Sequence, residues 1–295
     1  MSKCPLCGGS GKEKSFPYAT KWDSKDFEYI RCGDCKTVFV NPVPDELELA
    51  KMYKKENYHD KYYGSIDLKQ ARRPLRLLNR FCANVDSVLD FGCGNGSFLK
   101  AASYSGFSCV GVEYDEEVRK IANQNSGSPV YSFPELKAKD KKFGIIHLGD
   151  VLEHLQDPRA VTGELCRMLM PGGFILVESP LENNPSLVYW CAKCFRALKM
   201  KLKKDTRSSD APLHLFQTNA RALENFLIKN FNLRCLYSRI YETGWPYILA
   251  GSRQGFRRGL LKGAVGVCAV ILSRLDLRRK NKLGNRYLGL FQYEK

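Results

Sequence analysis

Residues 88–97 read Val88-Leu89-Asp90-Phe91-Gly92-Cys93-Gly94-Asn95-Gly96-Ser97. An apolar run predicted to form a strand leads here into three glycines at alternate positions and then into a helical pattern. Glycine lets the backbone turn sharply and approach a ligand that a Cβ would exclude, and the free amide groups at the start of a helix favour polar and anionic groups. The stretch therefore predicts the floor of a nucleotide-like cofactor site.

An acidic residue closes the next predicted strand. The strand Ser108-Cys109-Val110-Gly111-Val112 is followed by Glu113, and the chain from Asp90 to Glu113 is long enough for a strand, a helix and a second parallel strand. In such a unit the acid reaches the hydroxyls of a bound ribose. The glycine spacing separates two kinds of site, because nicotinamide and flavin sites usually read Gly-x-Gly-x-x-Gly, whereas this loop reads Gly-x-Gly-x-Gly.

With this loop and this acid the chain resembles the class I S-adenosylmethionine-dependent methyltransferases, whose first motif is a hydrophobic residue followed by Asp-x-Gly-x-Gly-x-Gly. The resemblance covers about residues 85–240, and its further motifs follow in the family's order. They are a buried strand at 143–148, the segment 150–155, a helix at 165–169, a turn at 171–173 and a strand at 174–178. It implies an α/β fold with a seven-stranded, doubly wound, Rossmann-like sheet that ends in an antiparallel strand at 286–293.

The resemblance also implies how S-adenosylmethionine is held. Asp90 orients the loop and approaches the amino-acid part of the cofactor, while Gly92 and Gly94 admit its methionine part. Glu113 accepts hydrogen bonds from the ribose, and Tyr114 lies beside the adenine. The full set of cofactor residues is Asp90, Gly92, Cys93, Gly94, Gly96, Glu113, Tyr114, Phe133, Asp150 and Val151.

Two cysteine pairs precede this domain. Cys4-Pro5-Leu6-Cys7 and Cys32-Gly33-Asp34-Cys35 have the spacing of zinc-ribbon knuckles. Four thiolates complete the tetrahedral coordination of zinc and leave no position for water, so the expected Zn²⁺ is structural. The segment between the pairs is too polar to form its own core, and metal binding would hold it folded.

The chain carries a formal net charge of +16, and most of the excess lies in two stretches. The first comprises Lys193, Arg196, Lys199, Lys201, Lys203, Lys204 and Arg207. The second comprises Arg253, Arg257, Arg258, Lys262, Arg274, Arg278, Arg279, Lys280, Lys282 and Arg286. Such stretches attract lipid headgroups, nucleotide diphosphates or nucleic-acid phosphates, and the alternative is a solvated helix face.

The predicted organisation has three parts: a zinc ribbon at 1–41, a linker helix and cap over the cofactor cleft at 42–84, and the methyltransferase domain at 85–295. Insertions are expected at about 181–213 and 246–284. The second insertion contains the apolar run 263–272 between basic segments, which is too short to cross a bilayer. It is predicted either to lie at a membrane interface or to pack as a helical hairpin on the sheet edge. Without a signal peptide or a spanning segment, a cytoplasmic location is expected, with peripheral contact to the inner face of the membrane.

Removing a proton from an alcohol acceptor calls for a general base, and histidine suits this task. Four histidines are present: His59, His147, His154 and His214. His147 falls in a predicted buried strand and is expected to be structural. His214, before the helix that begins near Thr218, is the first candidate for a base, and His154 is the second.

The resemblance to particular methyltransferases also indicates the class of methyl acceptor. The segment Glu153-His154-Leu155 and the proline-broken insertion are similar to ubiquinone-type O-methyltransferases, and the zinc knuckles followed by Asn41-Pro42 resemble methyltransferases of bacterial sugar and polysaccharide pathways. O-methylation of a sugar, free or nucleotide- or lipid-linked, is the leading hypothesis. A quinone-like lipid, RNA and a non-catalytic cofactor-binding scaffold stay open as alternatives. RNA is less favoured because the tetrad and the Pro-Cys dipeptide typical of base-modifying enzymes are missing.

Overall fold

The computed structural model describes residues 2–56, 59–62, 66–191, 193–194, 211–243, 266–275 and 282–294. The chain divides into two compact units. The first comprises residues 1–43, 180–226 and 238–287, and the second comprises 44–179, 227–237 and 288–295.

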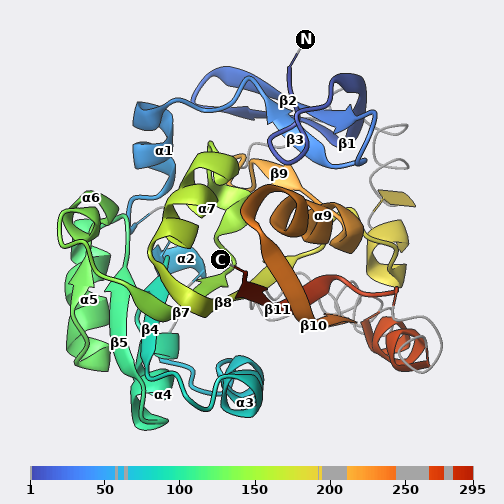
Figure 1. The fold of residues 1–295 in the computed structure, drawn as a ribbon. Coiled ribbons are helices and arrows are strands. Elements are labelled where there is room, and N and C mark those ends of the chain that lie inside the picture. The colour runs from blue at the N-terminus through green and yellow to red at the C-terminus, as the bar shows by residue number, and fades with distance from the viewer. Residues whose placement is uncertain are drawn as a thin grey trace. The chain divides into compact units, whose positions relative to one another are not determined.

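The larger sheet has seven strands in the order β10-β11-β8-β7-β4-β5-β6 (Figure 1). They are β4 (Ser87–Phe91), β5 (Ser108–Val112), β6 (Val130–Tyr131), β7 (Phe143–Gly149), β8 (Leu169–Pro180), β10 (Leu233–Tyr241) and β11 (Arg286–Tyr293). The pairs β4–β5, β4–β7, β5–β6 and β7–β8 are parallel. β11 runs antiparallel to β10, because Asn285 N bonds to Tyr241 O at one end and Glu294 N bonds to Asn232 O at the other. The predicted α/β sheet with its antiparallel closing strand is confirmed.

Helices alternate with these strands. They are α3 (Arg72–Phe81), α4 (Ser97–Tyr104), α5 (Glu116–Ser126), α6 (Phe133–Lys137), α7 (Pro158–Arg167) and α9 (Ala220–Phe231). Figure 1 shows α4 and α5 beside β4 and β5. Val88, Leu89, Ile145 and Ile146 of the central strands are fully buried, as expected for parallel strands covered on both faces.

One predicted boundary is wrong. The helix expected at 165–169 ends at Arg167, and the turn expected at 171–173 lies inside β8. Phe143 pairs with Leu169 and Ile145 with Phe174. Residues 170–173 of β8 therefore lie opposite a single residue of β7. They form a bulge in which the chain turns without leaving the sheet.

A smaller antiparallel sheet lies in the first unit, with the order β1-β2-β3-β9. Its strands are β1 (Gly11–Trp22), β2 (Lys25–Cys32), β3 (Val38–Asn41) and β9 (Phe216–Gln217). β3 ends before Pro42, because proline cannot donate to the ladder. β9 was not predicted: two residues from far along the chain pair with Val38 and Phe39.

The segment after the smaller sheet begins with α1 (Glu46–Met52) and continues through α2 (His59–Tyr62). A helix was predicted within the linker at 42–84, and α1 begins there with a capping box. The Asp45 side chain accepts from Glu48 N, and the Glu48 side chain accepts from Asp45 N.

The two predicted insertions are described in part. Most of the first basic stretch lies in residues 195–210, outside the described residues, and so do 244–265 and 276–281 of the second insertion. Residues 266–275, which overlap the apolar run at 263–272, form a helix. None of the described helices has the length and hydrophobicity needed to cross a bilayer.

Candidate active site

The loop after β4 is held against the end of β5. The backbone N–H groups of Gly92 and Cys93 both donate to Val112 O, at 2.8 and 2.9 Å. Gly96 has a φ of +83°, and a Cβ there would lie 2.8 Å from the carbonyl oxygen of Ala122. Only glycine fits this position without moving the backbone of α5.

The same loop meets the segment after β7. A Cβ on Gly92, where φ is +76°, would lie 2.5 Å from a methyl group of Val151. The structure thus brings together two predicted cofactor residues from separate motifs. Asp150 precedes Val151 with a φ of +55°, and its N–H donates to Glu178 O at 3.0 Å. The turn fixes the direction in which the chain leaves the carboxyl end of the sheet, where ligands bind in open α/β folds.

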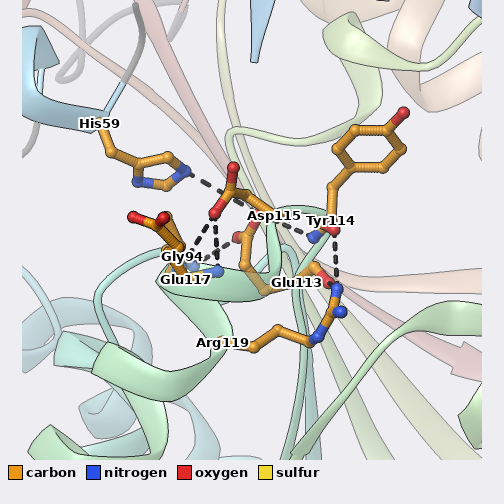
Figure 2. A network of polar contacts seen from close by, with 8 residues as sticks. His59, Gly94, Glu113, Tyr114, Asp115, Glu117 and Arg119 are labelled. Atoms are coloured by element: carbon orange, nitrogen blue, oxygen red, sulfur yellow. Dashed lines mark hydrogen bonds and ion pairs between the residues drawn. The ribbon is translucent and has the colours of Figure 1, made fainter. Parts of the chain in front are cut away.

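Glu113 lies at the end of β5 and joins the glycine loop to its own strand (Figure 2). Its carboxylate accepts from Gly94 N at 2.9 Å and from Tyr114 N at 2.7 Å. Burial raises the pKa of this carboxyl, and the N–H groups of Tyr114 and Gly94 act in the opposite direction. A buried carboxylate fixed in this way is an acceptor for hydroxyl groups.

Two aromatic residues predicted to flank the adenine differ in burial. The side chain of Tyr114 is 65% exposed, and its backbone oxygen accepts from Arg119 Nη1 at 2.7 Å (Figure 2). Phe133, the first residue of α6, packs edge-on against Phe91 with ring centroids 4.9 Å apart. Phe133 therefore lies at the end of β4, next to the loop.

A buried polar chain crosses three neighbouring strands beneath the loop. His147 Nδ1 and Asp90 Oδ1 are 2.8 Å apart, and His147 Nε2 lies 3.5 Å from Glu178 Oε2. The imidazole also stacks on Phe98, with ring centroids 3.8 Å apart. His147 is buried in β7, as predicted. It fixes the orientation of Asp90.

His147 predicts a pH-dependent stability. Burial disfavours the imidazolium, but Asp90 and Glu178 outweigh it and raise the pKa of His147 from 6.5 to about 9. A group whose pKa is raised on folding stabilises the protein fully below its unfolded pKa and loses this contribution as the pH rises through its folded pKa. Between pH 6 and pH 10 the free energy of unfolding of wild type should therefore fall by up to about 3 kcal/mol relative to that of His147→Gln. Urea unfolding of both proteins across this range measures the difference, and a constant difference would contradict the assignment.

The segment 44–84 touches the site at three points. The hydroxyl of Tyr53, after α1, lies 2.8 Å from His154 Nδ1. His59 Nε2 in α2 lies 3.9 Å from Glu113 Oε1 (Figure 2). Asp67 N donates to Ser97 Oγ, at the start of α4, at 3.1 Å. The sequence predicted a cap over the cofactor cleft here, but it assigned no role to His59 and no partner to Tyr53, because an isolated tyrosine or histidine carries no spacing that would reveal a distant partner.

The two candidate bases lie in different compact units. His154 belongs to the short 3₁₀ helix η1 (Leu152–His154) directly after Val151, in the unit that holds the glycine loop. The neighbouring Glu153 is buried and accepts from Ser179 Oγ at 3.4 Å. His214 belongs to the other unit, where its Nδ1 lies 2.7 Å from Glu182 Oε2.

The four predicted metal ligands form one cluster in the first unit. The Sγ atoms of Cys4, Cys7, Cys32 and Cys35 all lie within 4.8 Å of one another. The Cys4–Cys35 and Cys7–Cys32 sulfur distances are 3.6 and 3.5 Å, close to the ~3.8 Å separation that tetrahedral Zn–S bonds of ~2.3 Å produce. The donor set and its spacing fit zinc.

Comparison with known proteins agrees with this geometry. The sequence profile described as "Methyltransferase domain" matches residues 66–238, which is more than half of the chain. The chain belongs to this methyltransferase family. It is an S-adenosylmethionine-dependent methyltransferase.

Curated relatives of the methyltransferase include two ubiquinone biosynthesis O-methyltransferases. The protein from Shewanella sp. (strain ANA-3) is 28% identical over 166 residues, which cover 50% of this chain and 68% of the relative. The protein from Pseudomonas syringae pv. tomato is 30% identical over 107 residues, which cover 33% and 45%. A solved SAM-dependent methyltransferase from Archaeoglobus fulgidus is 19% identical, with a TM-score of 0.47 over 80% of this chain and 99% of that chain.

The residues of the methyltransferase fit its cofactor. The loop contains two positions where a Cβ would collide with neighbouring segments, and it ends at the amino end of α4. Glu113 has a buried carboxylate that would suit the hydroxyls of a ribose, and Asp90 is paired with His147. S-adenosylmethionine would supply a methyl group on a sulfonium, and these residues would bind and orient it.

Proposed function

We propose that this methyltransferase transfers a methyl group to a hydroxyl oxygen of a sugar or of a nucleotide- or lipid-linked sugar. Methyl transfer is an in-line displacement, so the protein must chiefly align the acceptor oxygen with the methyl carbon and sulfur. An alcohol must also lose its proton, and this requires a base close to the acceptor. The observation that carries the proposal is the pairing of Tyr53 with His154 directly after the loop that touches Gly92.

This pairing orients the imidazole of His154. In the tautomer in which Nδ1–H donates to the Tyr53 oxygen, Nε2 keeps its lone pair and can accept the proton of a hydroxyl. We propose His154 ahead of His214 as the base, because His154 shares a compact unit with the glycine loop. His214 with its partner Glu182 is the other candidate.

The sugar class is supported by the zinc knuckles and the following Asn41-Pro42, a combination similar to methyltransferases of bacterial polysaccharide pathways. A quinone-like lipid is the second candidate, because the curated relatives are named ubiquinone biosynthesis O-methyltransferases. RNA is the third, because the positive net charge favours binding to phosphates. A role in polysaccharide synthesis in the cytoplasm, at the inner membrane face, remains part of this proposal.

The four-cysteine cluster is proposed to hold a structural Zn²⁺. All four ligands come from the protein, so an ion there would hold the two knuckles together and would have no position for an acceptor. The metal would stabilise the small sheet and take no part in methyl transfer.

Exchange of His154 tests the proposed base. His154→Ala is expected to lower kcat by about 100-fold, the usual contribution of a general base, with cofactor affinity unchanged. Tyr53→Phe should cause a smaller loss by releasing the imidazole. His214→Ala is the matched control, and full activity of His154→Ala together with loss in His214→Ala would assign the base to His214.

An acceptor panel tests the substrate class. Radiolabelled methyl donor is offered with nucleotide sugars, polyprenyl-phosphate-linked sugars, a demethylated quinone precursor and total RNA, and the labelled product is analysed by mass spectrometry. The expected result is one methyl group on a sugar oxygen. Label confined to the quinone precursor or to RNA would replace the sugar by that class.

A further inference from the structure

The helix formed by residues 266–275 has an unusual arrangement of side chains. Its small residues Gly266, Ala269 and Ser273 are buried. Its large apolar residues face the solvent: the exposed fractions are 61% for Val267, 52% for Ile271, 44% for Leu272 and 55% for Leu275. The helix of an ordinary globular domain shows the opposite arrangement, with the large apolar side chains in the core.

The two sets lie on opposite sides of the helix. With about 3.6 residues per turn, positions 266, 269 and 273 share one face, and positions 267, 271 and 275 share the other. Ser273 Oγ donates to Leu283 O at 3.1 Å and secures the buried face. The large apolar face, which we call the outer face (Val267, Ile271, Leu272 and Leu275), is therefore presented outward by packing within the unit.

The helix is tied to the other basic insertion of the same unit. Gly284 N donates to Pro185 O at 3.2 Å, and Asn184 Nδ2 donates to the carbonyl oxygens of Lys282 and Gly284 at 2.9 Å. The helical segment after Ser186 carries Trp190, which is 52% exposed, with Lys193 Nζ 5.6 Å from its ring centroid. The segments that adjoin the two basic stretches are thus anchored at one junction.

The sequence of the two stretches that adjoin this junction is strongly basic. The stretch 253–286 contains ten basic residues against the single acid Asp276, and the stretch 193–207 contains seven against the single acid Asp205. Exposed Arg274 lies on the helix itself. We propose that the outer face inserts into the surface of an anionic lipid bilayer while exposed basic residues such as Arg274 and Lys282 bind its headgroups. Apolar insertion with basic flanks is the pattern of helices that lie in the membrane interface. RNA would attract the charge but would leave the outer face in water.

Vesicle co-sedimentation of the full chain tests the proposal. Wild type should bind vesicles of phosphatidylcholine with 30% phosphatidylglycerol at least tenfold more tightly than vesicles of phosphatidylcholine alone. The double variant Ile271→Gln with Leu275→Gln should bind anionic vesicles at least tenfold more weakly than wild type. The matched control is Ile228→Gln with Leu47→Gln, which places the same substitutions at exposed apolar positions of α9 and α1, and it should bind like wild type.

The single variants Ile271→Gln and Leu275→Gln, each expected to show an intermediate loss, guard against misfolding of the double variant. Calorimetric titration of S-adenosylmethionine should give the same affinity in all variants, so membrane binding and the proposed reaction can fail separately. Equal vesicle binding by the two double variants, or no binding of wild type to anionic vesicles, would overturn the proposal. Salt-dependent binding to RNA without binding to vesicles would assign the basic stretches to nucleic acid instead.

Discussion

Replacement of Glu113 by alanine is expected to weaken S-adenosylmethionine binding by about 100-fold or more. The carboxylate is proposed to accept hydrogen bonds from both ribose hydroxyls, and each hydrogen bond to a charged group contributes about 1.5–3 kcal/mol. The substitution also removes the acceptor that holds Gly94 N and Tyr114 N, so the glycine loop loses its tie to the end of β5. Calorimetric titration of the cofactor measures the loss.

Glu117→Ala is the matched control for this prediction. Glu117 lies four residues away in the first turn of α5 and is exposed, so the same charge is removed without touching the loop. Its cofactor affinity should stay within about twofold of wild type, since surface substitutions usually change free energies by less than ~0.5 kcal/mol. If Glu113→Ala bound the cofactor as wild type does, the ribose role assigned to this residue would be wrong.

The second large effect concerns the cysteine cluster. Purified wild type should contain one zinc ion per chain, and Cys32→Ser should contain almost none, because three sulfurs and a hydroxyl bind zinc much more weakly than four thiolates. Structural zinc sites contribute about 10–16 kcal/mol in small zinc-finger peptides. Loss of the ion should therefore unfold the small sheet, and residues 1–43 should become sensitive to protease. Metal analysis and limited proteolysis report the two consequences.

Cys82→Ser provides the comparison for the zinc prediction. Cys82 is a buried cysteine outside the cluster, so its replacement should leave the zinc content unchanged. Cofactor affinity should persist in Cys32→Ser, because the glycine loop lies in the other compact unit. Wild type without zinc, or Cys32→Ser with a full complement, would contradict a zinc site.

Local patterns predicted the parts of the site that are continuous in sequence. The strand, glycine loop and helix from Val88 onward, the acid at 113 and the closing strand at 286–293 all lie where they were expected. These features depend on backbone conformation and on apolar periodicity, and the local sequence determines both. The cysteine cluster was predictable for the same reason, since each knuckle has a fixed spacing.

Contacts between residues far apart in the chain could not be predicted from the sequence alone. The contacts Tyr53–His154 and His59–Glu113 join residues that show no periodic pattern. The two-residue strand β9 pairs with β3 across more than 170 positions, and so short a strand has no signature of its own. The sequence also left two environments open for the insertion that contains the helix at 266–275, a membrane interface or packing on the sheet edge. Its apolar run does not say which side chains are packed, and only the structure shows that the small ones are buried.

Because β9 completes the small sheet, residues 1–43 depend for their folding on residues near position 216. Asn219, which precedes α9, donates from Nδ2 to Cys35 O at 3.1 Å, and its Oδ1 accepts from Ala222 N at 3.0 Å. The side chain of Asn219 thus links the second zinc knuckle to the first turn of α9. Grafting residues 1–43 onto another enzyme, or trimming them to shorten this one, would leave an unprotected sheet edge on the graft and a frayed helix on the remainder.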